Sequence, residues 1–244
     1  MPQPHSTPNK SNSAVLAEWN DAYTYFLSRN RLFLGCCIAL FIVGMYFIFS
    51  GQLGDLIVTI NGKRNDFRDQ LFIFFTQFAE PQAYVTIILL FALIRYRSAI
   101  FALGCGVLAG IISAILKSIF GYARPLRYLY DNALETWGLL QLFDPELYNN
   151  SWAYTSFPSG HAMSAFALYS FVAFNANRWR IPIALLCFFF ATMVAFSRMY
   201  LLMHFLRDVV AGGIIGLMIG SFLFWAQFKL WPNNTFLDRG LLNK

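Results

Sequence analysis

The chain has 244 residues, of which 58% are hydrophobic and only 12% are charged, and its formal net charge is +6. A water-soluble domain carries about 25% charged residues, so this composition excludes a soluble globular protein and indicates an integral membrane protein. The basic residues are scattered rather than clustered, which favours contact with a lipid bilayer over binding of nucleic acid.

The N-terminal segment, residues 1–30, is polar and contains no short apolar stretch followed by a cleavage site. We therefore expect no removable signal peptide, and we expect this segment to be cytoplasmic. Two apolar stripes at helical spacing suit helices that lie in the membrane interface or pack on the bundle. They consist of Val15, Trp19, Tyr23 and Phe26, and of Phe67, Leu71, Phe74 and Phe78.

Six apolar segments approach the length of about 20 residues that a spanning helix needs. In chain order they are Leu32–Ser50, Gln82–Ile94, Ala99–Phe120, Ala162–Asn175, Ile181–Phe196 and Phe205–Phe228. The second and fourth are short. The sequence thus predicts an all-α polytopic membrane bundle of six transmembrane helices, forming a single domain over residues 1–244 with an outer loop at 121–157.

Small residues within these segments predict packing rather than chemistry. Cys36, Cys37, Cys105 and Cys187 all lie in apolar runs, without the spacing of a zinc site or a paired external loop. Gly212, Gly216 and Gly220 recur every fourth position of the last segment, a pattern typical of close helix contact.

Basic residues near the span ends favour a cytoplasmic location for both termini. Ten bases fall on that side and eight on the opposite side, and three of the eight belong to the candidate site described below. The ten are Lys10, Arg29, Arg31, Arg95, Arg97, Arg178, Arg180, Lys229, Arg239 and Lys244.

Three polar islands interrupt the apolar pattern, and this topology places all of them on the outer side. They are Lys117 with Arg124-Pro125, then Pro158-Ser159-Gly160-His161, and then Ser197-Arg198 with His204 and Asp208. Because charge at the edge of a membrane is expensive, it commonly marks a functional site.

Residues from all three islands are of the types that hold a phosphate group. Lys117, Arg124 and Arg198 would repel one another without an anion between them, and arginine grips phosphate through paired hydrogen bonds. Ser159 is a favourable N-cap, and Gly160 permits close approach to the amide groups at a helix start. Taken singly, a lysine or arginine here could instead reach toward lipid headgroups.

The third island suggests a nucleophile. His204 and Asp208 are four residues apart and share a helix face, where the carboxylate would orient the imidazole for attack. Arg198 and His204 would point about 120° apart on one continuous helix, so we expect a turn through residues 200–203. His161 could then protonate a leaving oxygen. The alternatives are a structural His–Asp pair and a polar contact at a helix end.

The three islands together resemble the type 2 phosphatidic acid phosphatase family, the lipid phosphate phosphatase superfamily. That family carries the motifs Lys-x6-Arg-Pro, Pro-Ser-Gly-His and Ser-Arg-x5-His-x3-Asp. All three are complete here, as Lys117-SIFGYA-Arg124-Pro125, Pro158-Ser159-Gly160-His161 and Ser197-Arg198-MYLLM-His204-FLR-Asp208.

The resemblance implies catalysis through a phosphohistidine, without metal or cofactor. It makes His204 the nucleophile, Asp208 its orienting partner and His161 the proton donor. The phosphoryl oxygens would be held by Lys117, Arg124, Ser159, Gly160 and Arg198.

The resemblance further implies a membrane lipid phosphate as substrate: undecaprenyl diphosphate, phosphatidylglycerophosphate or phosphatidate, or lipid A. We expect a bacterial inner-membrane protein whose active site faces the periplasm, and the motifs do not rank these lipids or set an oligomeric state. A phosphotransferase using the same phosphohistidine is the closest alternative, and a membrane transporter is the alternative from another class. The 121–157 loop is predicted either to cap the site or to anchor aromatic side chains in the interface.

Overall fold

The computed structural model describes residues 12–142, 152–232 and 234–242, and over these ranges the fold is all-helical. The first half contains α1 (Asn12–Ser50), α2 (Asp55–Asn61), α3 (Asp66–Thr76), the short 3-10 helix η1 (Gln77–Ala79), α4 (Pro81–Ile94) and α5 (Tyr96–Phe120). The second half contains α6 (Pro125–Asn132), α7 (Leu134–Gly138), α8 (Gly160–Asn175), α9 (Arg180–Tyr200) and α10 (Leu206–Lys229).

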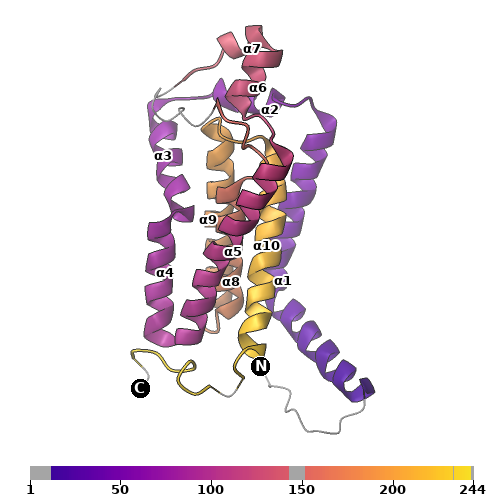
Figure 1. Ribbon diagram of the computed structural model, residues 1–244, viewed down its shortest axis with the longest axis vertical. Coiled ribbons are helices and arrows are strands. Elements are labelled where there is room, and N and C mark those ends of the chain that lie inside the picture. The colour runs from indigo at the N-terminus through magenta and orange to yellow at the C-terminus, as the bar shows by residue number, and fades with distance from the viewer. Residues whose placement is uncertain (1–11, 143–151, 233, 243–244) are drawn as a thin grey trace.

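The long helices run side by side, with the short helices α2, α6 and α7 gathered at one end (Figure 1). We call these three helices and their connections the outer cap. The α4–α5 turn, the end of α10 and the chain after it lie at the opposite end (Figure 1). Helix α8 contacts α5, α9 and α10 and is buried along most of its length, so it forms the centre of the bundle.

Within the described ranges, four helical stretches are long and apolar enough to cross a membrane: Asn20–Ser50, Tyr96–Asn132, Arg180–Tyr200 and Leu206–Lys229. A fifth is obtained if Asp66–Ala79 and Pro81–Ile94, which meet at a bend of 50°, form one span. The fourth predicted segment corresponds to α8. This helix has 16 residues, fewer than the roughly 20 that a spanning helix needs. The all-helical membrane fold is thus confirmed, whereas the count of six spans stays a prediction.

Both apolar stripes are helical. The first belongs to the beginning of α1, where the Phe26 ring packs edge-on against Phe174 with centroids 5.0 Å apart. The second runs through α3 and η1, where Phe78 stacks on Phe190 of α9 at 4.5 Å. Phe67 remains 74% exposed. The second stripe therefore packs on the bundle along one edge only.

The glycine stripe of α10 allows close contact with α8, as the spacing predicts. A Cβ atom at Gly216 would lie 2.2 Å from the carbonyl oxygen of Met163, and one at Gly212 would lie 2.5 Å from that of Ser159. Since real Cβ atoms do not come so near backbone oxygens, only glycine fits at these positions. The contact sets the spacing of the two helices that carry much of the candidate site.

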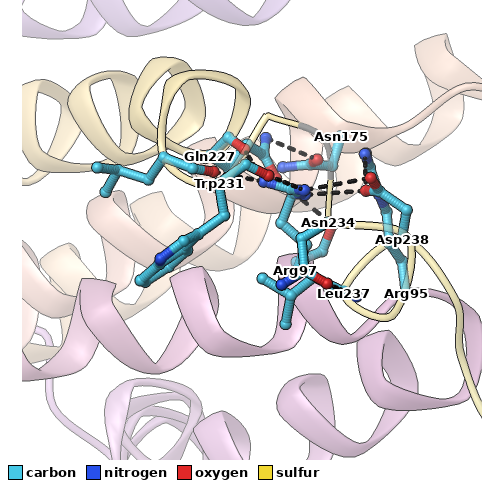
Figure 2. Close-up of polar contacts among 10 residues, drawn as sticks. Arg95, Arg97, Asn175, Gln227, Trp231, Asn234, Leu237 and Asp238 are labelled. Atoms are coloured by element: carbon cyan, nitrogen blue, oxygen red, sulfur yellow. Dashed lines mark hydrogen bonds and ion pairs between the residues drawn. The ribbon is translucent and has the colours of Figure 1, made fainter.

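A polar clamp holds the chain after α10 against the α4–α5 turn (Figure 2). The fully buried Arg97 donates to the carbonyl oxygens of Gln227, Leu230 and Trp231 at 2.6–2.8 Å and pairs with Asp238 at 2.9 Å. Arg95 also pairs with Asp238. The α4–α5 turn and the end of α10, which the clamp joins, lie at the end of the bundle opposite the outer cap (Figure 1).

Candidate active site

The eight predicted site residues come from the ends of five helices and converge beneath the outer cap. Lys117 lies in the last turn of α5, Arg124 is the N-cap of α6, and Ser159, Gly160 and His161 begin α8. Arg198 lies in the last turn of α9, His204 in the connection that follows it, and Asp208 in the first turn of α10.

The turn expected between Arg198 and His204 is present. Helix α9 ends at Tyr200, and Leu202 takes a left-handed backbone conformation with φ of 56°. This reversal brings the amide nitrogens of Met203 and His204 to 2.9 and 3.2 Å from the carbonyl oxygen of Arg198. Since a left-handed leucine costs about 1–2 kcal/mol, the surrounding packing must hold the turn in place. Leu202 is completely buried.

The start of α8 is tied to the start of α10. Ser159 caps α8, its hydroxyl accepting from the amide of Ala162 at 3.4 Å, and its own amide donates to the carbonyl oxygen of Asp208 at 2.9 Å. A Cβ atom at Gly160 would lie 2.9 Å from Ser113 Oγ and 3.6 Å from Lys117 Nζ. The lysine ammonium group therefore lies directly beside the first residue of α8.

Asp208 is fully buried and faces His204, but the two side chains do not share a hydrogen bond. The Asp208 Oδ2 atom accepts from Ser156 Oγ at 2.5 Å and from the amide of Phe205 at 2.9 Å. His204 Nδ1 lies 3.9 Å from the same oxygen and is buried without a hydrogen-bond partner. A small rotation of the imidazole would bring Nδ1 into hydrogen-bonding range, which leaves Nε2 as the nitrogen available for attack.

The electrostatics of the site favour a neutral His204 and a bound anion. Burial, followed by the charges of Arg198, Arg124 and Lys117, lowers the pKa of His204 well below 6.5, so the imidazole is uncharged at pH 7. The Nε atoms of Arg124 and Arg198 are buried without a hydrogen-bond partner. Buried unpaired donors of this kind are costly unless a ligand accepts from them.

The described part of the chain contains no group of three or more His, Cys, Asp or Glu side chains placed to hold a metal ion. The positive charge in the site comes instead from lysine and arginine.

Residues outside the three motifs also lie at the site. Ser156 donates to Asp208, as described above, and Thr76 Oγ1 accepts from Arg198 Nη1 at 2.7 Å. Glu80 Oε1 lies 4.0 Å from His161 Nε2. The available signal for the last was Glu80-Pro81, an acidic residue followed by a proline before an apolar run.

The outer loop at 121–157 supplies α6 and α7 of the outer cap, and residues 143–151 of this loop lie outside the described ranges. Asn61 of α2 holds the loop by donating to the carbonyl oxygen of Gln141 at 3.0 Å and accepting from its amide at 2.8 Å. The described part of the loop therefore packs on the end of the bundle that carries α2, next to the site.

Comparison with known proteins identifies one family. The model of the PAP2 superfamily matches residues 95–232, more than half of the chain. A PA-phosphatase related-family protein of Dictyostelium discoideum is 32% identical over 101 residues, which cover 36% of this chain and 37% of that relative. The match thus spans little more than a third of the relative's length.

Two solved structures share the fold. LpxE of Aquifex aeolicus has a TM-score of 0.57 at 22% identity, over 70% of this chain and 93% of its own. A transmembrane PAP2 type phosphatidylglycerolphosphate phosphatase of Bacillus subtilis also has a TM-score of 0.57, at 19% identity, over 86% of this chain and 98% of its own.

Proposed function

Because the chain belongs to the PAP2 superfamily, we propose that it acts as a single-domain membrane enzyme that removes phosphate from a lipid through a phosphohistidine at His204. One observation carries the proposal. The Nε atoms of Arg124 and Arg198 and the Nδ1 atom of His204 are all buried without a hydrogen-bond partner, and Lys117 Nζ lies next to Gly160 at the start of α8. A tetrahedral anion held by these cations would present its phosphorus atom to that imidazole.

In the first step of the proposed reaction, His204 Nε2 attacks phosphorus. A nitrogen–phosphorus bond forms, the bond from phosphorus to the lipid oxygen breaks, and His161 gives its proton to that leaving oxygen. Asp208 stabilises the positive charge that His204 acquires. The three cations and the amide groups at the start of α8 bind the equatorial oxygens as charge develops on them.

In the second step, water attacks the phosphohistidine, and His161, now neutral, takes a proton from that water. The nitrogen–phosphorus bond breaks, inorganic phosphate leaves, and the neutral His204 is restored. We propose that no metal ion takes part, since lysine and arginine supply the positive charge that phosphoryl transfer requires.

The substrate we propose is a lipid whose phosphate stands at the membrane edge: undecaprenyl diphosphate, phosphatidylglycerophosphate, phosphatidate or lipid A. We further propose a bacterial inner-membrane location, with the outer cap in the periplasm and both termini in the cytoplasm. The support is the distribution of basic residues in the sequence, of which ten fall on the side assigned to the cytoplasm and eight on the other side.

The test is release of free phosphate from each of these four lipids by purified protein in detergent, without added metal. His204→Ala should abolish release while the protein remains folded, and His5→Ala is the matched control because it removes a histidine outside the motifs. Full activity in the His204→Ala protein would refute the mechanism. If the lipid phosphate is labelled and the label appears on a second lipid instead of as free phosphate, the protein is a phosphotransferase.

A further inference from the structure

The break in the bent span between α3 and α4 faces the candidate site. Proline lacks an amide hydrogen and restricts the residue before it, so a helix readily begins at Pro81. Glu80, the N-cap of α4, is extended, with φ of −89° and ψ of 168°. The two helical parts meet here at 50°, and Glu80 is consequently placed at the bend rather than along a lipid-facing helix.

Side chains of α8 hold this bend in position. Tyr169 donates its hydroxyl to the carbonyl oxygen of Phe78 at 2.8 Å, and Ser164 donates to that of Ala79 at 3.4 Å. Ser164 lies three residues after His161, so the contact anchors the residue before Glu80 to the first turn of the helix that carries His161. The position of Glu80 relative to His161 is thereby determined by packing as well as by charge.

The bend brings two polar side chains to two motif residues. Thr76 accepts a hydrogen bond from Arg198 at 2.7 Å. Glu80 Oε1 lies 4.0 Å from His161 Nε2, a separation that a small rotation or one water molecule closes. The negative charge of Glu80 also acts on Arg198. About a third of each of the Glu80 and His161 side chains is exposed. Neither side chain is fully enclosed, so the distance between them can shorten when a substrate binds.

The charges around His161 explain why a carboxylate is needed there. Lys117 from α5, Arg124 from the start of α6 and Arg198 from α9 all act on it, and His204 faces it from the α9–α10 connection. Cations oppose protonation of an imidazole, yet a proton donor must carry a proton before it can give one. A bound phosphate would offset part of this repulsion, and a carboxylate 4.0 Å from His161 is placed to offset a further part.

We propose that Glu80 is the positioning residue of the proton donor: it holds His161 through Nε2, stabilises its protonated form, and leaves Nδ1 to deliver the proton to the leaving oxygen. The inference rests on the proposed lipid phosphatase reaction. It gives the bent span a role in catalysis, although none of the three motifs includes a residue of that span.

The test compares two leaving groups in Glu80→Gln, which keeps the shape of the side chain and removes its charge. Phosphatidate, phosphatidylglycerophosphate and lipid A have an alkoxide leaving group that needs a proton, and the lipid substrate is the one of these three that wild type hydrolyses fastest. The leaving group of p-nitrophenyl phosphate departs without one. We expect kcat/KM to fall at least ~10-fold on the lipid, part of the ~10²–10⁴-fold that general acid catalysis supplies, and to change less than twofold on p-nitrophenyl phosphate.

The second measurement is the pH dependence of kcat/KM on the lipid. Loss of the neighbouring negative charge should move the alkaline limb to lower pH by about one unit in Glu80→Gln. Glu80→Asp should leave the limb near its wild-type position. Glu135→Gln, the same change at an exposed residue of α7, is the matched control and should leave both rate and profile unchanged.

The outcomes are distinguishable. Equal losses on both substrates, with an unmoved alkaline limb, would show that Glu80 only maintains the fold and would overturn the inference while leaving the phosphatase proposal intact. A wild-type protein that is folded but releases phosphate from none of the four lipids would overturn the proposed function, and this inference with it.

Discussion

The contact between α8 and α10 makes Gly216→Ala a sharp test of the structure. The added methyl group would lie 2.2 Å from the carbonyl oxygen of Met163 and 3.0 Å from the amide nitrogen of Ala167, and ordinary van der Waals contact begins at 3.4 Å. Both neighbours are backbone atoms of a buried helix and cannot rotate away. The helices must therefore separate locally by about 1.2 Å.

Overpacking of this kind costs about 1–3 kcal/mol, and each kcal/mol lowers the Tm of a chain of this size by about 2–4 °C. We expect Tm to fall by about 2–12 °C for the purified protein in detergent. Because Ser159 at the start of α8 bonds to Asp208 of α10, we expect the displacement to reach the candidate site as well. A misplacement of 1 Å can cost about 10²-fold in rate, so phosphate release should fall by about that factor.

Gly110→Ala in α5 is the matched control, since a Cβ atom there meets nothing within 4 Å. Alanine favours a helix over glycine by about 0.5–1 kcal/mol, so this variant should keep its activity and unfold at the same or a slightly higher temperature. If Gly216→Ala and Gly110→Ala have equal Tm values and equal activities, the helix contact described here is wrong.

Three further predictions concern charge. Asp208→Asn should slow phosphate release by about 10²–10⁴-fold, because the carboxylate that faces His204 loses its charge; an unchanged rate would contradict this role. The lowered pKa of His204 keeps the proposed nucleophile neutral in mild acid, so the acid limb of kcat/KM should lie well below pH 6.5, and a limb at or above that pH would refute the electrostatic account. Partial burial raises the pKa of Asp238, but hydrogen bonds from Arg97 and Arg95 outweigh it, and the net direction is down. The carboxylate therefore stabilises the fold above its unfolded pKa of about 3.9 and loses this effect as pH falls through the lower folded value. The Tm gap between wild type and Asp238→Asn should accordingly narrow below about pH 4, and a gap independent of pH would count against the clamp.

Features that depend on residues close together in the chain could be predicted from the sequence. The polar islands stand out because His204 and Asp208 interrupt an apolar pattern only a few residues apart. The turn between Arg198 and His204 follows from helical geometry alone, and the structure contains it. The glycine stripe likewise predicts the close contact of α10 because its spacing equals roughly one helical turn.

Features that depend on distant segments could not be predicted in this way. Glu80 lies 81 residues before His161 in the chain, and their approach depends on the 50° bend of the span that carries Glu80. Arg97 was counted among the cytoplasmic bases, whereas it is fully buried. Its partners include backbone carbonyl oxygens of the chain around the end of α10. Since every residue has such an oxygen, the sequence contains no sign of the pairing.

The short central helix links the span count to the position of the site. Sixteen residues of α8 extend about 24 Å, less than the roughly 30 Å of a bilayer's hydrocarbon core. Protein rather than lipid surrounds most of α8, so its ends need not reach the membrane surface. A helix of this length starts below the outer boundary of the core when its other end lies near the inner one. Ser159 and Gly160, which we propose to bind phosphate, would then stand below the outer cap and above the apolar bundle, at the depth where a lipid phosphate can enter from the bilayer while its chains remain in it.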